Sequence, residues 1–221
     1  MHAKVVLRAV DFAAFGVVFD LANYQILITN YFFSPMRLFI ALDIPEDVRE
    51  RLRDYVERVR VYAPEARWTR LESLHVTLKF IGEVNDAKVQ EIKNALTQVK
   101  GKPFQVDFKE IGFFPNPRSA RVFWAGVSAA DALSQLASAV EESAEKVGVA
   151  REKRPYHAHL TLARAPESVA SRHCFRLLQE RLSSETPPQF GTMTAQEFFL
   201  YQSQIMRGGA RYTKLQRFPL Q

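Results

Sequence analysis

A tetrapeptide pattern that occurs twice limits the fold of this chain more than any other feature. HVTL begins at His75 and HLTL begins at His159, so both copies read histidine–apolar–threonine–apolar. Each copy lies in a run of alternating apolar and polar residues, which is the period of a half-buried β-strand. Residues two apart on a strand point to the same face, so Thr77 and Thr161 each accompany a histidine. The repeat predicts two similar halves, each built around one such strand.

The segments around the repeat predict an alternation of strands and helices. Strands are expected at residues 37–43, 67–69, 74–81, 104–114, 121–127, 159–164, 198–205 and 211–218. Helices are expected after Pro45, at 86–99, from Asp131 to about Gly148, and at 168–182. The links between strands are short, and Gly208-Gly209 suits a hairpin turn, so antiparallel pairing is favoured. The order indicates an α+β protein with two similar halves.

Residues 1–35 differ from the rest of the chain. The segment is apolar, but Asp11, Asp20 and Asn23 interrupt it, whereas a spanning helix needs about 20 uninterrupted apolar residues. It also lacks the clean apolar centre and cleavage site of a signal peptide. A new pattern opens at Met36. We therefore expect one domain over 36–221, preceded by an extension that a misassigned start would explain; a peripheral membrane anchor is the alternative.

The net charge and the cysteine count indicate which kind of partner and which cellular compartment suit this chain. The net charge is +6, and because the extension is neutral, all of it belongs to residues 36–221. Such a balance favours anionic partners such as RNA, phosphate esters or membrane surfaces. Cys174 is the single cysteine, which excludes an intramolecular disulfide and a thiolate metal cluster. These features predict a cytoplasmic protein, and we expect a monomer with no membrane partner.

Two imidazoles with neighbouring hydroxyls suit the cleavage of a phosphodiester. One imidazole takes a proton from the attacking oxygen, and the other gives a proton to the leaving oxygen. Hydroxyl groups and cations stabilise the charge on the remaining oxygens. A metal is the competing explanation, since His157 and His159 form a His-x-His pair. Catalytic zinc usually takes three protein ligands, and no carboxylate-rich segment lies beside either motif. We therefore expect no metal, with His157 supporting the site or facing the substrate.

Several longer segments extend the pattern into a family resemblance. They are MRLFIALDIP from Met36, LHVTLKFIGEV from Leu74, FPNPRSARVFWAGV from Phe114, HAHLTLAR from His157 and GARYTKLQRFPL from Gly209. In this order they resemble the two-histidine phosphoesterase superfamily, and most closely its RNA 2′,3′-cyclic phosphodiesterase branch, also called 2′-5′ RNA ligase-like. The resemblance covers residues 36–221. Ala158 departs from the pattern, because family members often have proline before the second histidine.

The resemblance implies a bilobed α+β fold, with two pseudo-symmetric lobes of antiparallel sheet, flanking helices and a central basic cleft. It implies hydrolysis of a terminal 2′,3′-cyclic phosphate on RNA to a 2′-phosphomonoester, without metal or other cofactor. His75 would be the proton donor and His159 the proton acceptor. Thr77 and Thr161 would hold the phosphate. The residues alone say only that one histidine gives a proton and the other takes it.

Three arginines are candidate phosphate or RNA contacts, because a guanidinium can grip a phosphate at two points. They are Arg121, Arg164 and Arg211. Arg164 is the strongest, since its strand continues the second motif. Strict alternation points it away from His159, so a bulge or a strand end would be required.

Three alternatives stay open. The first is a phosphodiesterase for small cyclic nucleotides or 2′-5′ oligonucleotides. The second is a non-catalytic module that binds RNA ends. The third is an additional ligation activity, since some relatives join RNA ends through a 2′-5′ linkage.

Overall fold

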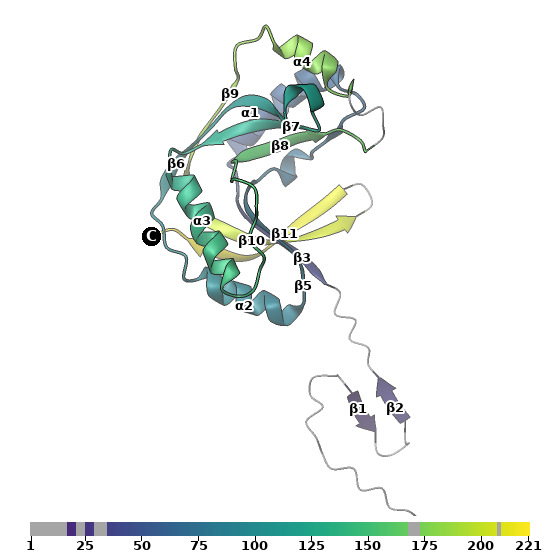
Figure 1. Ribbon diagram of the computed structural model, residues 1–221, viewed down its shortest axis with the longest axis vertical. Coiled ribbons are helices and arrows are strands. Elements are labelled where there is room, and N and C mark those ends of the chain that lie inside the picture. The colour runs from purple at the N-terminus through teal and green to yellow at the C-terminus, as the bar shows by residue number, and fades with distance from the viewer. Residues whose placement is uncertain (1–16, 21–24, 29–34, 168–172, 207–208) are drawn as a thin grey trace, which may run out of the picture. The chain divides into compact units, whose positions relative to one another are not determined.

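The computed structural model describes residues 17–20, 25–28, 35–167, 173–206 and 209–221. The chain divides into two units, Met1–Ser34 and Pro35–Gln221. In the first unit, β1 (Val17–Asp20) pairs antiparallel with β2 (Gln25–Ile28). Everything else described here lies in the second unit (Figure 1). No helix in the described ranges has the length and apolarity needed to cross a membrane.

The second unit contains two antiparallel sheets. The first sheet has the order β11-β10-β3-β5, and the second has the order β4-β8-β7-β6-β9. The strands are β3 (Met36–Leu42), β4 (Arg67–Trp68), β5 (Val76–Val84), β6 (Phe104–Phe114), β7 (Val122–Ser128), β8 (His159–Arg164), β9 (Gln189–Ala195), β10 (Glu197–Met206) and β11 (Gly209–Pro219). In the first sheet, β3 lies between β5 and the late strand β10. Each copy of the tetrapeptide therefore lies in a different sheet.

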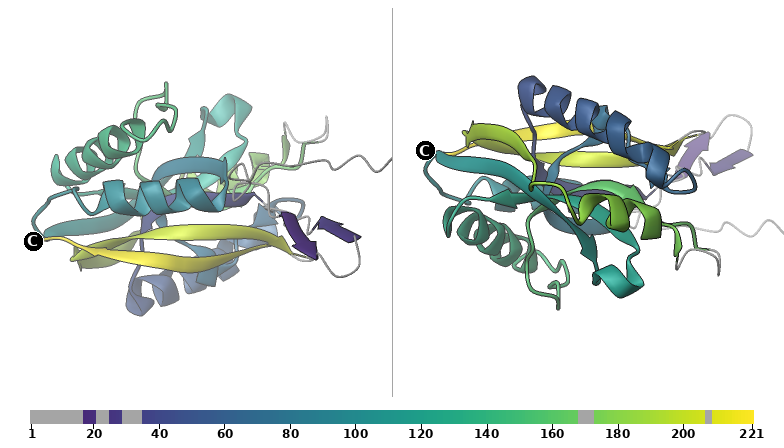
Figure 2. Two further views of the ribbon diagram at one scale, coloured as in Figure 1. Left: turned by 90° about the horizontal axis from the view of Figure 1, so that it is seen from below. Right: turned by 90° about the horizontal axis from the view of Figure 1, so that it is seen from above.

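Helices cover the outer faces of the sheets (Figure 2). The helices are α1 (Glu46–Val59), α2 (Asp86–Leu96), α3 (Ala132–Glu145) and α4 (Arg176–Leu182), with 3₁₀ turns η1 (Arg60–Tyr62), η2 (Leu71–Ser73) and η3 (Pro117–Ser119). α3 packs on β5 and on α2, whereas α1 packs on β9 and α4 on η1. β5 of the first sheet and β8 of the second sheet contact each other. The side of each sheet that carries the histidine and threonine of its tetrapeptide is called its inner face. The structure confirms the expected α+β fold with two antiparallel lobes.

Most predicted elements are found within a few residues of their expected bounds, but β9 was missed. Its sequence, QFGTMTA, has few apolar residues, and Gly191 breaks their alternation. Gly191 has φ 116°, which favours glycine, and a Cβ there would lie 2.2 Å from Nη1 of Arg51. The helix predicted at 168–182 begins only at Arg176, and residues 168–172 lie outside the described part of the chain.

A β-bulge interrupts both histidine strands at the same place. On β5, Thr77 pairs with Ala41 and Lys79 with Ile40, which leaves Leu78 as the extra residue. On β8, Thr161 pairs with Trp124 and Ala163 with Phe123, which leaves Leu162 as the extra residue. An extra residue reverses the side-chain alternation beyond it.

The bulge on β5 overturns one expectation from the sequence. Alternation predicted a buried Phe80 and a polar-face Lys79. Instead, Phe80 is 61% exposed, and Lys79 is buried against α3, where its Nζ lies 2.6 Å from Oε1 of Glu141. The inner face of this strand thus continues from Thr77 to Phe80.

Candidate active site

His75 and His159 are held in the same way. His75 lies just before β5, and its Nδ1 is 2.8 Å from the carbonyl oxygen of Ser73. His159 opens β8, and its Nδ1 is 2.7 Å from the carbonyl oxygen of His157. A carbonyl oxygen only accepts hydrogen bonds, so Nδ1 carries a proton in both rings. Nε2 is then the atom of each neutral ring that is free to take up a proton.

Both imidazoles have pKa values below the ordinary 6.5. Burial lowers the pKa of His75 to about 4, against the opposing effects of the Ser73 carbonyl and Asp43. The charge of His159 adds to this lowering, so the two rings interact electrostatically across the inner faces. Burial also lowers the pKa of His159, with smaller contributions from the charges of His157 and Arg164. Both rings are neutral at pH 7 in the ligand-free protein.

Aromatic side chains account for this burial. The ring of His75 lies 4.5 Å from the ring of Phe39 and 5.1 Å from that of Tyr212, between centroids. The ring of His159 lies 5.0 Å from that of Phe114. Each histidine therefore has an apolar wall supplied by its own sheet.

The threonines and one arginine lie beside the histidines. Thr77 and Thr161 are half-buried and share the inner face with their histidines. Nη2 of Arg164 is 3.5 Å from Oγ1 of Thr161, and its charge acts on both His159 and Tyr212. The bulge at Leu162 reverses the alternation, so the guanidinium of Arg164 points to the inner face. Strict alternation along the sequence required such a bulge if Arg164 was to face the site.

The other candidates from the sequence lie differently. Arg211 pairs with Gln204, so alternation places it on the face opposite Tyr212, away from the histidines. Arg121 lies just before β7, exposed, and its carbonyl accepts from the amide of Ala165. Alternation thus turns Arg211 away from the histidine pair, and Arg121 forms no side-chain hydrogen bond or ion pair with another described residue.

The ring of His157, by contrast, lies near the site. Its centroid is 5.0 Å from the ring of Phe114 and 6.3 Å from that of His159. Its carbonyl also fixes the tautomer of His159. Among the described residues, no group of three or more His, Cys, Asp or Glu side chains is arranged to hold a metal.

Sequence reasoning missed two inner-face side chains, Tyr212 and Phe80. Tyr212 pairs with Ser203 and packs against His75. Burial raises the pKa of its phenol, so it keeps its proton and can donate a hydrogen bond. Alternation along 211–218 could have placed it opposite to Arg211. Phe80 had no such signal, because only the bulge exposes it.

A cavity of about 280 Å³ lies between residues that follow β3 and residues of β9, β10 and β11. It is lined by Asp43, Ile44, Pro45, Met193, Thr194, Ala195, Gln196, Glu197, Phe199 and Lys214. Asp43 accepts from Nζ of Lys214 at 2.5 Å and from Nη2 of Arg49 at 3.3 Å. The charge of Asp43 also raises the pKa of His75, so the wall of this cavity and that histidine interact electrostatically.

Comparisons with known proteins agree with this arrangement. A family model described as LigT like Phosphoesterase matches residues 42–124 and 126–212. The chain is 36% identical to an RNA 2′,3′-cyclic phosphodiesterase of Archaeoglobus fulgidus, over 83% of this chain and 99% of that protein. It is 32% identical to the protein of the same name from Escherichia coli, over 85% and 98%.

The solved structures place the whole second unit in the same fold. The crystal structure of E. coli LigT complexed with 3′-AMP superposes with a TM-score of 0.69 at 32% identity, covering 85% of this chain and 99% of that one. The family match spans well over half of the sequence and includes both histidine motifs. The chain therefore belongs to the LigT-like phosphoesterase family.

Proposed function

We propose that this protein hydrolyses the terminal 2′,3′-cyclic phosphate of RNA to a 2′-phosphomonoester, without a metal. The observation that carries the proposal is the pair of imidazoles with identical Nδ1 anchors, each beside a threonine. Two such rings can take and give a proton across one phosphate. The names of the relatives support cyclic phosphate on RNA as the substrate.

The reaction follows from this geometry and the family resemblance. Nε2 of His159 accepts a proton from water as its oxygen attacks phosphorus. The bond from phosphorus to the 3′ oxygen breaks, and His75 gives its Nε2 proton to that oxygen. A 2′-phosphate and a 3′-hydroxyl result. Because the pKa of His75 is about 4 in the free protein, the anionic substrate must raise it before the ring can act as donor.

The neighbouring groups suit the rest of the substrate. The hydroxyls of Thr77 and Thr161 and the guanidinium of Arg164 would hold the nonbridging oxygens and stabilise the charge that develops there. Tyr212 would donate a further hydrogen bond. The exposed ring of Phe80 offers a flat surface on which a base can stack.

Product analysis on a short RNA with a 2′,3′-cyclic end tests the proposal. We expect 2′-monoester to form in the presence of EDTA. His75→Ala and His159→Ala should each lower kcat by about 10²–10⁴-fold, because each removes one proton-transfer group. His173→Ala is the matched control, since His173 is exposed and lies outside the site. A 3′-monoester product, or loss of activity on chelation with recovery on adding zinc, would contradict the proposal.

A 2′-5′ ligation activity uses the same side chains, with the 5′-hydroxyl of a second RNA attacking phosphorus in place of water and the bond to the 3′ oxygen breaking as before. We infer that the protein acts in the cytoplasm as a monomer. Light scattering after size-exclusion chromatography checks the oligomeric state.

The free thiol of Cys174 is buried, and burial raises its pKa, so it stays an unreactive thiol.

A further inference from the structure

Two arginines face each other across neighbouring strands beside the site. Arg67 on β4 pairs directly with Arg164 on β8, and β4 is the edge strand of the second sheet. Directly paired residues of antiparallel strands project to the same face, and like charges in that position repel. Neither guanidinium forms an ion pair with an acidic residue in the described part of the chain. Such a pair is suited to a bound anion.

Of the two arginines, Arg164 is the one nearer to the histidines. Arg164 reaches Thr161 and acts on His159, so it belongs to the reaction centre. Arg67 lies one strand further out, about 4.8 Å away along the sheet. Arg67 is exposed and lies on the edge strand, so it is on the solvent side of Arg164.

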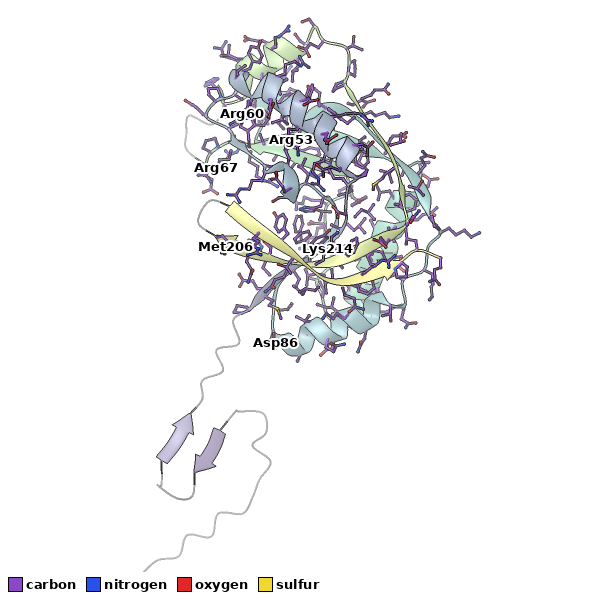
Figure 3. All side chains as sticks on the ribbon, turned by 180° about the vertical axis from the view of Figure 1, so that it is seen from behind. Arg53, Arg60, Arg67, Asp86, Met206 and Lys214 are labelled. Carbon is purple, nitrogen blue, oxygen red and sulfur yellow. The ribbon has the colours of Figure 1, made fainter. Side chains whose placement is uncertain are left out.

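A third arginine, Arg70, lies close in sequence to Arg67. Arg70 precedes η2, which lies beside β11, and its Nε is 3.8 Å from the position that a Cβ on Gly209 would take. Figure 3 shows Arg67 and Met206, at the end of β10, on the same side of the molecule. Glu65 and Glu72 flank the segment in sequence, and both are exposed without a described ion pair.

From this placement we infer that Arg67 binds the phosphodiester immediately upstream of the cyclic phosphate, so that the site selects oligonucleotides over cyclic mononucleotides. The inference rests on the proposed function. The cyclic phosphate occupies the histidines, threonines and Arg164. The next phosphate along the strand lies between Arg164 and Arg67, and the RNA leaves past Arg70.

Three substrates test this inference. They are a 2′,3′-cyclic mononucleotide, a dinucleotide with a 2′,3′-cyclic end, and the same dinucleotide with a neutral methylphosphonate linkage. Arg67→Ala should lower kcat/KM for the natural dinucleotide about tenfold, because it removes a charge-assisted contact. It should leave the other two substrates unchanged and reduce the salt dependence for the dinucleotide by about one unit of slope. Arg60→Ala, an exposed and likewise unpaired arginine on η1, is the control.

The outcomes separate this inference from the proposed function. Equal losses on all three substrates would show that Arg67 serves the reactive phosphate or the fold, and no loss would show that it makes no contact; either result overturns the inference. If the wild type turns over none of them, the proposed function fails instead. Fluorescence anisotropy with a labelled dinucleotide ending in 2′-phosphate then still tests Arg67: weaker binding by Arg67→Ala alone supports the inference, and equal binding overturns it.

Discussion

At the scale of single residues, the two imidazoles are held by the same kind of contact, from Nδ1 to the carbonyl oxygen two residues earlier, but differ in their surroundings. The sequence repeat predicted the histidines and threonines because a period of two places them on one face. It could not predict the depth of burial, because the wall of His75 comes from β3, β10 and β11, which are distant in sequence. That burial has two consequences for pH dependence.

The first consequence concerns stability. The unfolded chain binds a proton at His75 near pH 6.5, but the folded chain binds it only near pH 4. Between these values the unfolded state holds more protons, so the free energy of unfolding decreases as the pH falls. We expect His75 to contribute up to about 3 kcal/mol of this loss between pH 7 and pH 4. Urea unfolding of the wild type and His75→Gln at pH 7 and 4.5 measures it.

The variant should lose less stability on acidification than the wild type. His173→Gln, which removes an exposed histidine, should behave as the wild type does. An equal loss in the wild type and His75→Gln would show that the ring is not buried as described.

The second consequence concerns the rate. The proposed reaction needs His75 protonated and His159 neutral. This form is one of the two singly protonated forms of the pair, which in the free protein are together most abundant between the two lowered pKa values. We therefore expect a bell-shaped profile of kcat/KM with its maximum between about pH 4 and 6.5. The profile of kcat should lie at higher pH, because the bound anion raises both pKa values. Steady-state kinetics from pH 3.5 to 9 would show the opposite order if this reasoning were wrong.

At the scale of elements, the strands were predictable and the bulges were not. Alternation identifies a strand, but an extra residue leaves no local mark in a sequence such as HVTLKFIG. Phe80 and Arg164 follow these bulges, so their inward direction depends on pairing with β3 and β7. β9 was missed for a different reason, since a glycine with a positive φ interrupts its apolar–polar alternation.

The ion pair behind the first bulge should be important for stability. Lys79 is 2% exposed in its side chain and Glu141 is 16% exposed, so Glu141→Gln leaves a buried charge without its partner. We expect a loss of about 3–5 kcal/mol in the free energy of unfolding, measured with urea. The double variant Lys79→Met with Glu141→Leu should recover most of it.

A comparison with a surface pair isolates the effect of burial. Arg176 and Glu180 form an exposed pair on α4, and Glu180→Gln should change stability by less than about 1 kcal/mol. Similar losses at Glu141 and Glu180 would mean that the buried pair is not needed to hold β5 against α3.

At the scale of the whole molecule, we expect residues 36–221 to fold and act without the segment before them. All the residues named above as building the site lie in the second unit, Pro35–Gln221. A chain that starts at Met36 should therefore match the full chain in kcat/KM and in its thermal midpoint, measured by calorimetry. A midpoint several degrees lower would show that the segment stabilises the domain.

The place of β10 in the first sheet also bears on how the protein is made. Chains emerge from the ribosome from the N-terminus onward, and β3 and β5 can pair early. β10 and β11, which supply Tyr201 and Tyr212 beside His75, follow all the other strands in the sequence and are translated after them. A nascent chain that stops after β9 should therefore carry both histidines but leave His75 open to water. We expect such a chain to be inactive, so that the site is complete only once β10 and β11 have left the ribosome.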